Sequence, residues 1–95
     1  MSVYQEVKER LASLQDQFDA LFDEAENLKA WMEETMEKGE ASPDANQQQV
    51  SKRLGNQYRE LCHFIDGLDG PAADALLRLQ DRTIILQVAE KGKFV

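Results

Sequence analysis

The chain has 95 residues and carries 18 acidic against 11 basic side chains, which gives a formal net charge of −7. This charge argues against direct binding of nucleic acid or of an anionic membrane, because both would need a basic surface. The single cysteine, Cys62, excludes an intrachain disulfide and a zinc framework. No apolar stretch reaches the ~18 residues of a transmembrane helix and no secretory signal is visible, so we expect one cytoplasmic domain over residues 1–95.

Apolar residues in the N-terminal segment recur at alternating spacings of three and four, which is the heptad pattern of a coiled coil. This pattern predicts one long helix over about residues 2–38. Toward its C-terminal end the apolar stripe widens to include Phe22, Trp31 and Met36, and a wider stripe indicates contact with two neighbouring helices. With Tyr4 taken as heptad position a, the a and d positions hold Tyr4, Val7, Leu11, Leu14, Phe18, Leu21, Ala25, Leu28 and Met32.

Proline and glycine concentrate in two places that divide the rest of the chain, a loop over residues 39–43 and a turn over residues 67–70. The second helix is predicted over about residues 44–66, with either Ser42 or Asp44 as its N-terminal cap. Gly55 interrupts this helix. A close approach of two helices at that glycine would explain its presence.

The third helix is predicted over about residues 71–89, because Asp69-Gly70-Pro71 is a typical helix start. The stretch over residues 83–88 is rich in β-branched side chains, which leaves a C-terminal strand as the alternative. In that alternative, Phe94 and Val95 form the returning strand of a hairpin, or the strand pairs across a dimer.

Three amphipathic helices with short connections predict an all-α fold, an antiparallel three-helix bundle with one long coiled-coil-like N-terminal helix. Small helical domains often gain stability by oligomerising. We therefore expect a homodimer or a higher oligomer, joined where the seam of the long helix is narrow and the shorter helices leave it uncovered. The predicted oligomer seam comprises Tyr4, Val7, Leu11 and Leu14.

The net charge belongs to the first predicted helix. Residues 1–40 hold eleven of the 18 acids and four of the 11 bases, whereas residues 41–95 are neutral. Ten of these eleven acids fall at heptad positions b, c or f, away from the apolar seam. This acidic strip is either a solvated outer face or a surface that meets a basic protein partner. Its main members are Asp16, Asp19, Asp23, Glu26, Glu33 and Glu37.

The sequence offers no catalytic, cofactor-binding or metal-binding constellation, so we expect neither an enzyme nor a bound cofactor. Cys62 and His63 are adjacent, and adjacent residues on a helix do not face each other, so they cannot form a nucleophile–base pair. Glu60 and His63 have the Glu-x-x-His spacing of di-iron bundles, but such a site needs this motif on two helices. The chain has one histidine.

Together these features predict a non-catalytic protein–protein interaction module, such as an adaptor, a small chaperone or an inhibitor. Phe22, Trp31 and Met36 would supply apolar anchors, and the acidic strip would steer the approach of the partner. The alternative is a nucleic-acid mimic, whose carboxylates imitate phosphates and occupy the basic DNA- or RNA-binding site of another protein. Binding by a mimic would weaken steeply with salt, because it would rely on charge.

Overall fold

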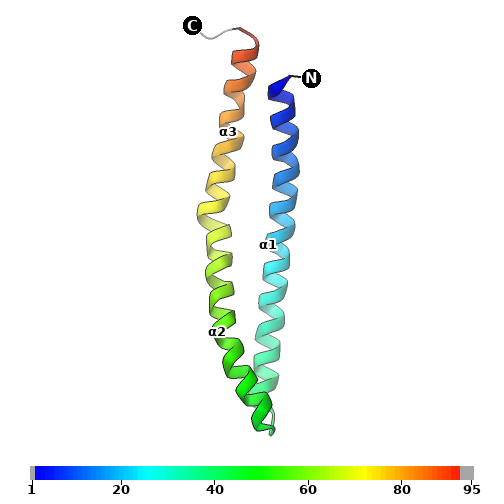
Figure 1. Cartoon of the computed structure of the whole chain (residues 1–95), viewed down its shortest axis with the longest axis vertical. Coiled ribbons are helices and arrows are strands. Elements are labelled where there is room, and N and C mark those ends of the chain that lie inside the picture. The colour runs from blue at the N-terminus through cyan, green and yellow to red at the C-terminus, as the bar shows by residue number, and fades with distance from the viewer. Residues whose placement is uncertain (1, 93–95) are drawn as a thin grey trace.

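Two long helical arms lie side by side along the whole length of the molecule (Figure 1). The first arm is α1 (Val3–Ala41), and the second arm consists of α2 (Ala45–Gly67), the π-helical segment η1 (Leu68–Ala72) and α3 (Ala73–Glu90). The computed structural model describes residues 2–92. The hairpin measures 72 × 21 × 12 Å, and its radius of gyration is 21.1 Å. A compact chain of this length would have a radius near 12 Å.

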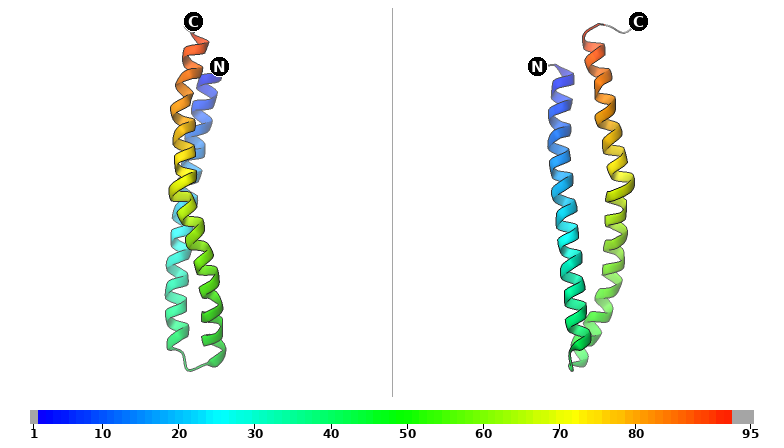
Figure 2. Two further views of the ribbon diagram at one scale, coloured as in Figure 1. Left: turned by 90° about the vertical axis from the view of Figure 1, so that its left-hand side faces the viewer. Right: turned by 180° about the vertical axis from the view of Figure 1, so that it is seen from behind.

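The all-α prediction and the long N-terminal helix are confirmed over the described residues. The three-helix bundle is wrong for the single chain, because α2 and α3 do not fold back on each other. They follow one another end to end, and both pack against α1. Viewed from the side, the second arm crosses α1 near the middle of the molecule, as expected for helices that wind around each other (Figure 2).

Polar side chains cap the start of α1, at the open end of the hairpin, and the start of α2, at its base. Ser2 caps α1, where its Oγ accepts a hydrogen bond from the backbone N–H of Gln5 at 3.0 Å. Of the two candidate caps for α2, Asp44 takes the position, and its carboxylate accepts from the N–H of Asn46 at 2.9 Å. The Gln48 amide then donates to the carbonyl of Ser42 at 2.7 Å. These bonds close a connection shorter than predicted, since α1 runs on through the expected loop start to Ala41.

The arms approach each other closely at Gly39, which is buried near the base of the hairpin. A Cβ atom on Gly39 would lie 2.7 Å from the Cβ of Ser51, nearer than real Cβ contacts allow. Ser51 is itself buried, and its hydroxyl donates to the carbonyl of Met36 at 2.8 Å. The close approach predicted at Gly55 is therefore misplaced, because a Cβ there would meet only the Met36 sulfur at 3.9 Å.

The predicted turn over residues 67–70 is wrong, because the chain stays helical through η1. Gly67 has helical backbone angles, φ −65° and ψ −39°. Pro71 has no N–H, and its ring would collide with the carbonyl four residues earlier in an α-helix. The wider π turn accommodates this ring without breaking the helix. Leu68 is buried against the first arm, which anchors the segment.

The π segment absorbs extra residues in the second arm. The side chains of Tyr58 and Glu33 are hydrogen bonded across the arms, and so are those of Gln80 and Gln15. Between these two cross-links the first arm uses 18 residues and the second arm uses 22. An insertion of four residues into a heptad pattern is a stutter, which changes the local winding. In Figure 1 the second arm bows outward in this region and then returns to α1.

The C-terminal stretch is helical up to Glu90, so the strand alternative is wrong for residues 83–88. The proposed return at Phe94 and Val95 lies outside the described residues. At the open end of the hairpin, the backbone N–H of Tyr4 donates to the Glu90 carboxylate at 2.7 Å. This bond ties the start of α1 to the end of α3.

The core of the hairpin is a single thin layer between the arms. Among the described residues, no large side chain is fully buried. The buried apolar residues are Ala25, Met32, Ile65, Leu68 and Leu76, joined by the polar Ser51 and Thr83. Each arm therefore buries one stripe and leaves its other faces in water.

Candidate functional site

One side of the hairpin exposes a row of large apolar side chains, which we call the apolar face. Leu14, Leu21 and Leu28 occupy successive d positions of α1 and remain close to half exposed, and Trp31 at a g position is 56% exposed. The face continues over the second arm. Its members are Val3, Leu14, Leu21, Leu28 and Trp31 of α1, Val50 and Phe64 of α2, and Leu79 of α3.

Local geometry places these residues of the two arms on the same side. An open groove of about 450 Å³ between α1 and α2 is lined by Leu21 and Leu28 from one arm and by Phe64 from the other. Toward the open end, Leu14 and Leu79 each precede one member of the hydrogen-bonded Gln15–Gln80 pair. In an antiparallel pair of helices, equivalent offsets from facing residues lie on the same side. The apolar face thus runs across both arms.

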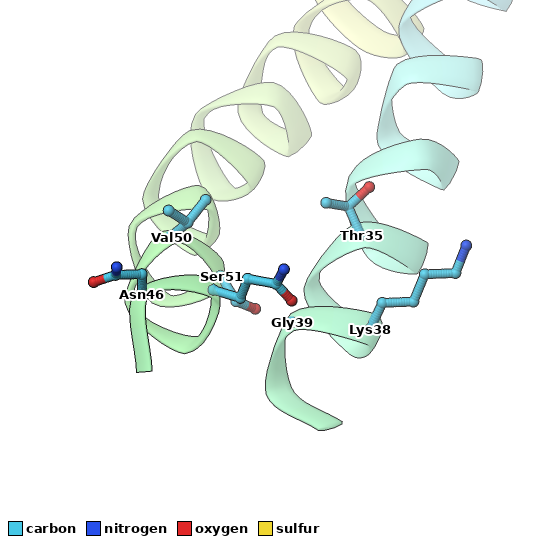
Figure 3. Close-up of a pocket in the computed structure, with 7 residues that line it drawn as sticks. Thr35, Lys38, Gly39, Asn46, Val50 and Ser51 are labelled. Atoms are coloured by element: carbon cyan, nitrogen blue, oxygen red, sulfur yellow. The ribbon is translucent and has the colours of Figure 1, made fainter. Parts of the chain in front are cut away.

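At the base of the hairpin the apolar face ends in a hollow of about 300 Å³ (Figure 3). Thr35 and Lys38 line it from α1 and Val50 from α2, and Gly39 and Ser51 lie between them. Val50 is 63% exposed. The hollow offers an apolar side chain beside small polar ones, which suits packing of another side chain better than chemistry on a substrate.

The three predicted apolar anchors do not form one patch. Trp31 belongs to the apolar face, whereas Phe22 and Met36 occupy e positions on the opposite flank of the α1 seam and are half-buried against the second arm. Phe22 lines a groove with Leu68 of η1. The widening of the stripe in the sequence therefore reflects both flanks of one contact with the second arm, and no third helix covers Trp31 within the described chain.

Most of the predicted oligomer seam is occupied within the chain. Tyr4, Val7 and Leu11 are half-buried where α1 faces α3, and Tyr4 and Leu11 share a groove with Thr83. Leu14 differs, since it is 46% exposed. Only this last member of the seam belongs to the apolar face.

The acidic strip lies on the flank of α1 away from the apolar face, at heptad positions b and f. Glu26 is half-buried and the other five members are exposed. Neutral donors satisfy two of them, since the Gln15 amide donates to Asp19 at 2.9 Å and the Tyr58 hydroxyl donates to Glu33 at 2.7 Å. Asp19 and Asp23 line a groove floored by Phe18 and Leu68. This flank thus combines carboxylates with some apolar surface.

The hydrogen bond to Glu33 raises the pKa of Tyr58, because the neutral phenol donates to the carboxylate; partial burial and the neighbouring Cys62 act in the same direction. Two ion pairs within residues 2–92 involve acids outside the strip, Arg10–Glu6 at 2.7 Å and Lys38–Glu34 at 2.9 Å. Lys38 lowers the pKa of Glu34 through this contact, and Glu34 raises that of Lys38. The strip itself is not neutralised by these pairs.

The residues weighed for catalysis do not converge. Cys62 is half-buried, whereas Glu60 and His63 are exposed on the same helix. In the part of the chain that the structure describes, no group of three or more His, Cys, Asp or Glu side chains is arranged to hold a metal ion. Over residues 2–92, none of the helices has the length and apolar character needed to cross a bilayer.

Comparison with protein-family models, with curated proteins and with solved structures gave no match to this chain. The candidate site therefore rests on geometry alone, and it consists of the apolar face and the acidic strip. Sequence reasoning identified the strip, Trp31 and, as part of the oligomer seam, Leu14, but it placed Leu21 and Leu28 in the core of the bundle. No local signal separates the two roles, because the a row is as apolar as the d row; its members are Tyr4, Leu11, Phe18, Ala25 and Met32.

Proposed function

We propose that this chain is a non-catalytic protein–protein interaction module that works as a homo-oligomer and binds a protein partner through its helical faces. One observation carries the proposal, namely the apolar face that the hairpin leaves uncovered along both arms. Large contiguous apolar surfaces on a small protein are typical of interaction sites. The thin core between the arms supports this proposal, because so small a buried layer gains stability when another helical surface covers it.

The two flanks of α1 suit different parts of an interaction. Apolar anchors such as Trp31 contribute affinity when a partner desolvates them. The acidic strip contributes long-range attraction toward a basic protein surface and so speeds encounter. The adaptor, small chaperone and inhibitor roles all fit this division.

The test compares three baits in extracts of the native host: the unmodified chain, Trp31→Ala and Ile85→Ala. Ile85 is an apolar control, 51% exposed and outside the apolar face. Proteins retained by the chain and by Ile85→Ala are expected to be lost from Trp31→Ala, as quantified by mass spectrometry. Circular dichroism confirms that each bait is folded. Equal retention by all three baits would contradict the proposed role of Trp31.

The second candidate is a nucleic-acid mimic. It is favoured because the acidic strip lies on an exposed flank, and because neither ion pair within residues 2–92 includes a member of the strip. Reversing Asp16, Asp19, Asp23 and Glu26 to Lys would abolish binding by a mimic, and added salt would weaken it steeply. Retained binding after the charge reversal eliminates mimicry and leaves the apolar face as the contact.

A further inference from the structure

The exposed leucines of α1 form a symmetric row. Leu14, Leu21 and Leu28 are spaced by seven residues, and Leu21 lies at almost the midpoint of a helix that runs from Val3 to Ala41. An antiparallel copy of this helix, related by a two-fold axis at Leu21, would bring Leu14 against Leu28 of the second copy. The same operation pairs Leu21 with its own equivalent.

We propose that a second copy of this chain covers the apolar face, with α1 packed antiparallel on α1 across a two-fold axis at Leu21, to form a four-helix bundle. This inference rests on the proposed function only in identifying the apolar face as an interaction surface. It names the occupant of that face in the free protein, which a host protein that binds through Trp31 would displace, and it leaves the acidic strip on the outside of the dimer.

The surface area of the chain fits such a dimer. The folded chain exposes 7254 Å². A compact monomer of its mass would expose about 5,500 Å². The excess of about 1,700 Å² in each chain, or about 3,400 Å² in a dimer, falls within the range of obligate homodimer interfaces. Covering the apolar face would thus bring the chain close to ordinary burial.

The flanking positions are compatible with the symmetric arrangement. In an antiparallel pair, g positions face g positions, so Arg10 comes opposite Trp31 of the second copy and Gln17 opposite its Glu24. An Arg side chain over an indole ring is a favourable cation–π contact. Gln can donate a hydrogen bond to Glu. Ten of the eleven α1 acids sit at b, c and f, so carboxylates do not face each other across this interface.

A second copy is favoured over an unrelated helix because the face extends over the hairpin and requires an equally long partner with a matching seven-residue repeat. The antiparallel arrangement is favoured over one with both hairpin tips at the same end. In that alternative, α1 would pack on the other copy's second arm, and Leu21 would face η1. That segment bows outward and presents Gly70, Pro71 and Ala72 without a large exposed apolar side chain (Figure 1).

The test measures the mass of the intact chain in solution and then locates the two-fold axis by disulfide cross-linking. Sedimentation equilibrium in the micromolar range is expected to give twice the 10.8 kDa of one chain. For cross-linking, Cys62→Ala removes the native thiol, and a single cysteine is introduced by Leu21→Cys. Ala20→Cys is the matched control, one residue away and on an outer face. Leu21→Cys should give a covalent dimer on mild oxidation, and Ala20→Cys should stay monomeric on a denaturing gel.

Each result decides the proposal. A doubled mass together with selective cross-linking at residue 21 supports it, and a mixture of Leu14→Cys and Leu28→Cys chains should then cross-link to each other. A single-chain mass, any assembly other than a dimer, or a dimer in which both cysteines behave alike overturns it. A monomer that still retains a host protein through Trp31 would overturn only this dimer and leave the proposed function standing.

Discussion

Leu21 and Asp23 are two residues apart on one helix, yet they belong to opposite surfaces of the hairpin. On α1, the apolar face consists of d and g positions that the second arm does not cover, whereas the acidic strip consists of b and f positions on the opposite flank. Between these two surfaces lies the a row, whose members Ala25 and Met32 are buried against the second arm. A single helix thus makes three surfaces, and only the a row is accounted for by the fold of one chain.

In this molecule heptad position, and not hydrophobicity alone, decides whether a residue of α1 is buried against the second arm or left on the surface. An a residue stabilises the hairpin directly. A d leucine contributes little within one chain because nearly half of it stays in water. A carboxylate at b or f adds to the net negative charge of α1 and, except for Glu26, is exposed. Substitutions that move one kind of residue into the position of another therefore separate the three roles.

The largest expected effect comes from placing a charge on the apolar face. In the proposed dimer, Leu21→Asp buries two carboxylates at the two-fold axis, so it should cost about 3–5 kcal/mol. Ala30→Asp puts the same charge on an exposed f position and should cost only about 1–2 kcal/mol, from lower helix propensity and from repulsion by Glu26 and Glu34. Urea unfolding at one fixed chain concentration measures both. Equal stabilities would show that the apolar face is not buried by association.

Both faces keep their arrangement only while the arms stay in register, and the glycines within α1 and α2 test that register. Gly39→Ala forces a Cβ against Ser51 and should cost about 1–3 kcal/mol. Gly55→Ala makes only an ordinary van der Waals contact with the Met36 sulfur and should gain up to about 1 kcal/mol from better helix propensity. Thermal unfolding followed by circular dichroism distinguishes the two. A stabilising Gly39→Ala would mean that the arms separate near the base.

Local patterns in the sequence predicted the individual helices well, but contacts between residues far apart in the chain decide how the helices associate. The heptads of α1 and the caps of α2 depend on neighbours a few residues away, so pattern alone predicted the long helix and limited the cap of α2 to Ser42 or Asp44. The Gly67–Pro71 stretch has the composition of a turn, yet Leu68 packs on α1 and holds it in a helix. That contact depends on a residue far away in the chain, which no local pattern contains. Because the chain does not turn there, α3 continues the second arm and does not fold back as a third layer.

The candidate site divides in the same way. The acidic strip could be placed from heptad positions, because exposed b and f positions need no knowledge of the partner helix. Trp31 could be named as an anchor but not separated from Phe22, because both flank the a row and only the position of the second arm distinguishes the flanks. Predicting the apolar face required knowing that one helix, and not two, packs on α1.

Removing a charge from the acidic strip should stabilise the hairpin slightly, whereas Leu21→Asp and Gly39→Ala destabilise it. Asp19 and Asp23 are four residues apart on α1 and repel each other. Asp23→Asn should therefore stabilise the hairpin by a few tenths of a kcal/mol, about 0.3. Repeating the urea titration in concentrated NaCl should erase the gain, because salt screens exposed charges. A gain that persists at high salt would assign the effect to helix propensity or hydrogen bonding instead.

The smallest effect is a pH dependence at the edge between the seam and the acidic strip, where Tyr58 donates to Glu33. The hydrogen bond favours the neutral phenol, so the pKa of Tyr58 is raised in the folded chain. In the unfolded chain the phenol loses its proton near pH 10. Above that pH the unfolded state binds fewer protons than the folded state, so stability falls as pH rises toward the higher folded pKa.

Ultraviolet absorbance can follow this titration in a Tyr4→Phe variant, which leaves Tyr58 as the only tyrosine of the two in the chain. The midpoint should lie above the ordinary value of about 10. It should fall in Tyr4→Phe with Glu33→Gln, because a neutral amide favours the protonated phenol less than a carboxylate does. A titration midpoint that is the same with and without Glu33→Gln would show that Glu33 does not raise the pKa of Tyr58. If the titration midpoint of Tyr58 responds to Glu33→Gln, and Leu21→Asp lowers the free energy of unfolding by several kcal/mol, the two sides of α1 differ in energy as expected. The acidic side then contributes little to stability and the apolar side contributes much.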